Sequence, residues 1–86
     1  MRKITTSSGF ACEVRDNLCN DMELFDDLLG LEKGDMRRLP AVVDKVVGDA
    51  KARLYDHLRG PDGIVPISGV LAEVREIVTQ AGAKNS

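Results

Sequence analysis

The chain has 86 residues, of which 43% are hydrophobic, 3% aromatic and 30% charged. A chain of this length forms one domain with a small core, which excludes a multi-domain enzyme and favours a binding role. Its net charge of −2 argues against a general nucleic-acid binder, and its longest uncharged stretch, residues 63–72, is too short for a membrane span.

The small net charge conceals opposite charges along the chain. Residues 13–35 carry eight acids and two bases, whereas residues 36–60 carry six bases and three acids. These segments can attract one another within the fold or face different partners, and solvated helix faces also explain them. We expect a cytoplasmic protein, because the basic start Met1-Arg2-Lys3 is not followed by the apolar stretch of a signal peptide.

The predicted elements begin with a β-hairpin over about residues 3–14. Ile4-Thr5-Thr6 and the segment 10–14 are rich in β-branched or apolar residues, and they flank the turn signal Ser7-Ser8-Gly9. Alternate residues of the second arm should face apolar material: Phe10, Cys12 and Val14. Because an isolated hairpin is barely stable, the strands must lie on the helices or pair with another chain.

A helix is predicted over about residues 18–30. Its apolar stripe has spacings of four, three and four, and leucines widen it: Leu18, Met22, Phe25 and Leu29, with Leu24, Leu28 and Leu31 beside them. Asn20 and Glu23 match a capping box, although an earlier cap at Asp16 or Asn17 also fits. We expect Asp26-Asp27 to be solvated on the outer side of this helix.

Two further helices are predicted over about residues 36–47 and 49–59. Pro40 fits the first turn of the earlier helix, where N–H groups lack intrahelical partners, and Gly48 ends it. Asp49 is the expected cap of the later helix. The earlier helix has a broad apolar face that also suits a buried strand: Leu39, Val42, Val43, Val46 and Val47.

The last predicted helix, over about residues 67–81, has the clearest amphipathic pattern. Its apolar positions keep helical spacing throughout: Ile67, Val70, Leu71, Val74, Ile77, Val78 and Ala81. Glu73, Arg75 and Glu76 are expected outside, and Gly82 is expected to end the helix. The sequence therefore predicts a mainly α (α+β) fold: one globular domain over residues 1–82, with a hairpin and about four helices in a compact bundle, and a flexible tail at 83–86.

The sequence contains none of the common catalytic or cofactor motifs. Phosphate-binding glycine loops, HExxH, GxSxG and calcium loops are all absent. Cys12, Cys19 and His57 are too few for a zinc site, and both thiols are expected to be small apolar fillers. His57 and Asp56 do not make a catalytic pair, because neighbouring side chains on a helix diverge. We therefore expect no enzymatic activity, no metal and no cofactor.

Five short segments, taken in order, carry a resemblance that runs along nearly the whole chain: 4–10, Asp21-Met22-Glu23-Leu24, 54–59, Gly63-Ile64-Val65-Pro66-Ile67 and Lys84-Asn85-Ser86. In this order they resemble small tail assembly chaperones, a family from the tail-gene clusters of long-tailed bacteriophages and prophages. The resemblance implies a cytoplasmic protein, absent from the mature virion, that coats the tape-measure protein until tail-tube subunits assemble around it.

The candidate partner face is the valine-rich side predicted for the helix over residues 36–47, which could bind the tape-measure protein or another tail component by helix-in-groove contact: Leu39, Val42, Val43, Val46 and Val47. The same residues also suit the core of a small domain. Open hairpin edges lead us to expect self-association. The alternative function is a small prophage or host regulatory adaptor, which could bind DNA through Arg53 and Arg59.

The end of the chain carries a separate hypothesis. Ala83-Lys84-Asn85 can be encoded by GCA AAA AAC, which contains the slippery run A AAA AAC. The resemblance implies a second, longer product made by ribosomal frameshifting at such a site. An ordinary polar tail explains the same residues.

Overall fold

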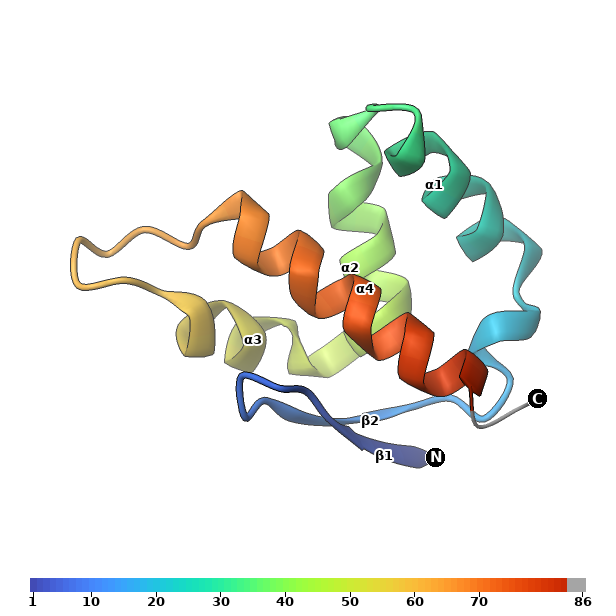
Figure 1. Cartoon of the computed structure of the whole chain (residues 1–86), viewed down its shortest axis with the longest axis horizontal. Coiled ribbons are helices and arrows are strands. Elements are labelled where there is room, and N and C mark those ends of the chain that lie inside the picture. Colours follow the sequence, from blue (N-terminus) through green and yellow to red (C-terminus); the bar gives the residue numbers. More distant parts are fainter. Residues whose placement is uncertain (84–86) are drawn as a thin grey trace.

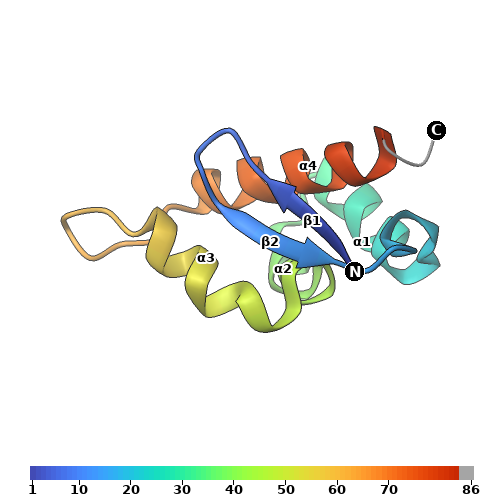
Figure 2. The same ribbon diagram turned by 90° about the horizontal axis from the view of Figure 1, so that it is seen from below.

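A two-stranded hairpin covers one side of a helical layer (Figures 1 and 2). The computed structural model describes residues 1–83. Its strands are β1 (Arg2–Thr5) and β2 (Ala11–Val14), and its α-helices are α1 (Met22–Glu32), α2 (Leu39–Val47), α3 (Lys51–Leu58) and α4 (Ile67–Ala83). Three short 3-10 turns join them: η1 (Leu18–Asn20), η2 (Met36–Arg38) and η3 (Gly48–Ala50). This arrangement confirms the predicted mainly α (α+β) fold with an N-terminal hairpin.

The hairpin packs its apolar side into the core, as its alternating pattern predicts. The strands are antiparallel with Ile4 opposite Cys12, and the inward residues are buried: Ile4, Phe10, Cys12 and Val14. Helix side chains cover part of both outer edges. Gln80 donates to the Thr5 carbonyl at 3.0 Å, and Arg53 donates to the Ala11 carbonyl at 2.9 Å. The edges are therefore less open to pairing than the sequence suggests.

The first helix begins later than predicted. Leu18 lies in η1, outside the helix, and α1 starts at Met22. The cap is Asp21, whose carboxylate accepts a hydrogen bond from the Leu24 N–H at 3.1 Å. The predicted caps at Asn20, Asp16 and Asn17 are therefore wrong, because Asp21 has the extended backbone that lets its carboxylate reach the free N–H groups.

The second and third predicted helices are joined without a gap. α2 ends at Val47, and η3 connects it directly to α3, so within residues 1–83 these two α-helices belong to one continuous helical stretch and the predicted four helices form three such stretches. Gly48, with φ of +53°, lets the backbone turn sharply at this corner. Asp49 makes no capping bond, which corrects its predicted role, because it lies inside the 3-10 turn.

The last helix, α4, packs one face into the core. Val70, Val74, Ile77 and Ala81 are buried on it, as predicted. The helix continues through Gly82 to Ala83, so Gly82 does not end it. Lys84 to Ser86 lie outside the described residues, and the flexible tail and the frameshift hypothesis remain predictions there.

Glu73 of the last helix contradicts the amphipathic pattern. Glu73 is buried, although its position predicts an outward carboxylate. Its Oε1 accepts hydrogen bonds from the Thr6 hydroxyl at 2.7 Å and the Ser8 hydroxyl at 3.0 Å. Glu76, one turn later, accepts from the N–H and hydroxyl of Ser7 at 2.7 and 2.8 Å. Two carboxylates of α4 thus hold the hairpin turn, which is why Glu73 can be buried.

The centre of α4 supplies a direct test of this core. Val74 is fully buried, so Val74→Asp places an unpaired carboxylate among apolar side chains. Burying this unpaired carboxylate costs ~5 kcal/mol, which is comparable to the whole stability of a small domain, so we expect the variant to be unfolded. Circular dichroism on heating measures this. Thr79→Asp adds the same charge at an exposed site of the same helix and should keep a cooperative transition; a folded Val74→Asp protein would contradict the packing.

Candidate partner-binding site

The valine-rich face predicted to bind a partner lies inside the domain. All five of its residues are buried: Leu39, Val42, Val43, Val46 and Val47. The reason is the central position of α2, which contacts α1, α4 and β2. This prediction is corrected, because a partner has no access to that face in the folded chain.

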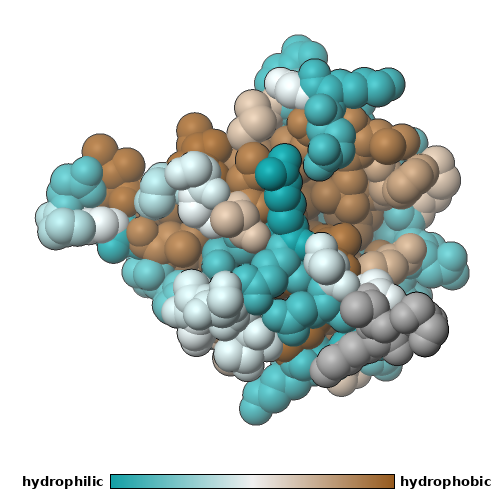
Figure 3. All heavy atoms as spheres, in the orientation of Figure 1, coloured by the Kyte–Doolittle hydropathy of each residue, from teal (hydrophilic) through white to brown (hydrophobic). Residues whose placement is uncertain are grey.

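The outer side of α1 is the apolar surface that the structure offers instead. Met22, Phe25 and Leu29 are 64%, 52% and 43% exposed, and their spacing places them in one row, which we call the α1 stripe. Leu24 and Leu31, across the helix, are buried. Hydrophobic atoms gather over α1 and between α1 and α4 (Figure 3). The predicted inward stripe is therefore turned outward.

Ion pairs across the helices explain this orientation of α1. Asp27 lies on the inner half of the helix, where its carboxylate is 2.6 Å from Lys45 Nζ and 3.2 Å from Arg38 Nη1. These pairs lower the pKa of Asp27 and raise that of Lys45, the hydrogen bond between them being the largest cause. The prediction of a solvated Asp27 is wrong, and the acidic and basic segments do attract one another within the fold.

Sequence reasoning missed the α1 stripe because several leucines compete for the core. Apolar residues cover about half of the circumference of this helix, which is more than the side that packs on the core can bury. This excess of apolar residues was the signal in the sequence that could have predicted an exposed apolar row on α1. An amphipathic helix with one inner face needs no second apolar row, so the surplus itself predicts an exposed surface.

A smaller apolar hollow lies where the first turns of α2 and α4 approach α3. It encloses about 320 Å³ and is lined by seven residues: Met36, Leu39, Pro40, Tyr55, Val65, Ile67 and Val70. Ile67 and Met36 at its rim are exposed, the former contrary to the predicted inward position. The hollow is large enough for one or two apolar side chains of a partner.

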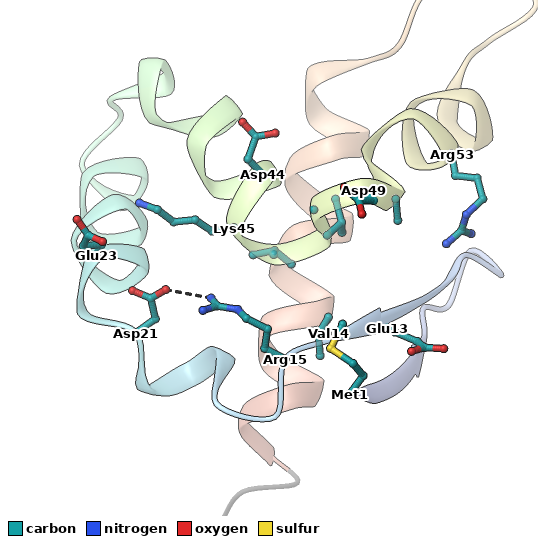
Figure 4. A pocket seen from close by; sticks show the side chains of 14 residues that line it. Met1, Glu13, Val14, Arg15, Asp21, Glu23, Asp44, Lys45, Asp49 and Arg53 are labelled. Atoms are coloured by element: carbon teal, nitrogen blue, oxygen red, sulfur yellow. Dashed lines mark hydrogen bonds and ion pairs between the residues drawn. The ribbon is translucent and has the colours of Figure 1, made fainter.

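A charged groove of about 820 Å³ lies between β2, α1 and the corner at η3 (Figure 4). Its basic side chains are held by groups of the protein. Arg15 pairs with Asp21 at 2.9 Å, and Arg53 points to the hairpin, where its guanidinium lies over the Phe10 ring. Lys45 is held by Asp27. The groove therefore has its basic side chains engaged, while its acids Glu13, Glu23 and Asp49 form no ion pair among residues 1–83.

The remaining polar residues singled out by the sequence have structural roles. His57 Nε2 lies 3.0 Å from the Ser8 hydroxyl, and that hydroxyl donates to the Glu73 carboxylate. A serine whose proton is held by a carboxylate is not activated by the imidazole, so this cluster fastens the turn. Asp56 pairs with Arg59 at 3.3 Å, not with His57.

The candidate DNA-contacting arginines and the two thiols are accounted for as well. Arg53 binds the Ala11 carbonyl and Arg59 the Gly63 carbonyl. Cys12 is buried, and burial is the largest cause of its raised pKa. Cys19 is exposed, so its predicted role as a core filler is wrong.

The described residues hold neither a cluster of metal ligands nor a helix suited to a membrane. Within residues 1–83, no three Cys, His, Asp or Glu side chains gather as metal ligands would. None of the helices in that range combines the length and the hydrophobicity of a membrane span.

Comparison with known proteins adds no assignment. No family model matches the chain, and neither a curated protein nor a solved structure resembles it significantly.

Stability at acid pH tests the ion pairs that orient α1. Asp27 has a lowered pKa, so its stabilising contribution is complete above the unfolded value of about 3.8 and is lost as the pH falls through the folded pKa. Asp27→Asn should lower the urea midpoint at pH 7 and shrink the further loss between pH 7 and about pH 3. The neighbouring Asp26→Asn, in an exposed position with no ion pair among residues 1–83, is the matched control. Equal behaviour of the two variants would contradict the role of Asp27.

Proposed function

We propose that this chain is a non-enzymatic binding protein that covers apolar helical segments of a client before assembly. The observation that carries the proposal is the α1 stripe, because a small monomeric domain gains nothing from exposing three large apolar side chains in one row. A helical client can lay its own apolar face along such a row.

The sequence resemblance supports a particular client. Tail assembly chaperones hold the tape-measure protein, a long helical chain whose apolar stripes are exposed until the tail tube encloses it. We accordingly propose that this protein is a tail assembly chaperone that acts in the host cytoplasm and is absent from the mature virion. The apolar hollow beside the first turns of α2 and α4 is a second point at which a client side chain could bind.

We expect a gene for a long coiled-coil protein beside the gene for this chain, and co-expression of the two proteins tests the proposal. We expect the wild-type chain to keep that protein in the soluble fraction and to co-purify with it. Phe25→Ser with Leu29→Ser should abolish both effects, because each removes apolar area from the contact. Ile64→Ser is the control, since Ile64 is also an exposed apolar residue but lies in the loop between α3 and α4, far from α1 (Figure 1). A client that is soluble without the chain, or bound equally by the stripe variant, would refute the proposed role.

A further inference from the structure

The α1 stripe has acidic margins as well as an apolar centre. Helical spacing places Asp26, and beyond it Glu23, along one side of the row and Glu32 along the other. All three are exposed. A cation at the C-terminal end of the row, Lys33, offsets only part of this charge.

These marginal acids are poorly neutralised within the domain. Glu23 and Asp26 form no ion pair among residues 1–83, whereas the inward acids Asp21 and Asp27 are both paired. Glu32 lies 3.6 Å from Arg75, but both side chains are more than half exposed, so the pair is weak. The fold thus uses the inner carboxylates of this region and leaves the outer ones available.

We propose that the occupant of the α1 stripe is a basic amphipathic helix of another polypeptide. This inference rests on the proposed function and specifies its partner. The helix lays an apolar row along Met22, Phe25 and Leu29, and its flanking Lys or Arg side chains pair with Asp26 and Glu23. The apolar row supplies the contact area, and the charges select the partner and its direction along α1.

The same charges disfavour two other occupants. A twofold contact between α1 helices of two copies would bring each Asp26 close to its counterpart near the centre of the row, where like charges repel. An anionic membrane surface attracts amphipathic helices with basic margins, not acidic ones.

Binding of two designed helical peptides by the full chain tests the inference. Both peptides are about 20 residues long with leucines at helical spacing, and their flanking positions are all Lys in one and all Glu in the other. Fluorescence anisotropy should show the basic peptide binding about fivefold or more tightly at low salt, with the difference shrinking at high salt. Phe25→Ser should weaken the binding of the basic peptide, and Ile64→Ser should not.

Charge reversal gives the decisive comparison. Glu23→Lys with Asp26→Lys should exchange the preference in favour of the acidic peptide. Glu13→Lys with Asp49→Lys makes the same change at two exposed acids beside the charged groove and should leave the preference unaltered (Figure 4). An unchanged preference in the first variant, or an equal effect of both variants, would overturn the inference.

The remaining outcomes separate this inference from the proposed function. Equal binding of the two peptides, lost in Phe25→Ser, would refute the basic partner and leave the binding role intact. Failure of both peptides to bind would refute the inference, while co-purification with the coiled-coil protein would still decide the function. Self-association abolished by Phe25→Ser in sedimentation would identify a second copy as the occupant.

Discussion

The ion pairs of Asp27 determine which surface this protein presents. They join the inner half of α1 to α2 through Lys45 and to η2 through Arg38. With Asp27 held inward, Leu24 and Leu31 enter the core, and the opposite row of α1 is turned to the outside. A rotation of the helix that buried Phe25 would pull this carboxylate away from both cations. The exposed apolar row and its acidic margins therefore follow from the burial of Leu24 and Leu31 together with the ion pairs that Asp27 makes beside them.

A second polar contact fixes the hairpin. The Glu73 carboxylate is buried, and the hydroxyl groups of Thr6 and Ser8 donate to it. Two short strands have little apolar area of their own, so the hairpin depends on being seated against α4. The buried carboxylate ties the turn to the helix at one end, and the apolar strand residues pack against the core along the rest of the hairpin.

The Asp27 ion pairs and the Glu73 hydrogen bonds leave two regions of the surface that differ in what they can bind. At the hairpin turn the polar side chains are bonded to α4, and in the charged groove Arg15, Lys45 and Arg53 are held by groups of the protein. Around α1, apolar side chains and unpaired acids remain free. A surface of this kind suits a helical partner better than a small substrate, because it is a row on a convex helix and not an enclosed pocket. The proposed chaperone role uses this difference between the two regions.

The sequence by itself determined the local elements of this protein. The alternation around Phe10 to Val14 predicted the hairpin, and the spacing of apolar residues in α4 predicted a helix with Val74 and Ile77 inside, because local periodicity decides secondary structure and its inner face. Only the tertiary structure decided the direction of α1 and the burial of Glu73. Both depend on partners distant in the chain: Lys45 for Asp27, and the hairpin turn for Glu73. The sequence correctly predicted that the valine-rich face of α2 is apolar, but α1, α4 and β2 cover that face. No local pattern specifies whether the fold encloses this face of α2 or the α1 stripe, because the answer depends on how the helices pack together.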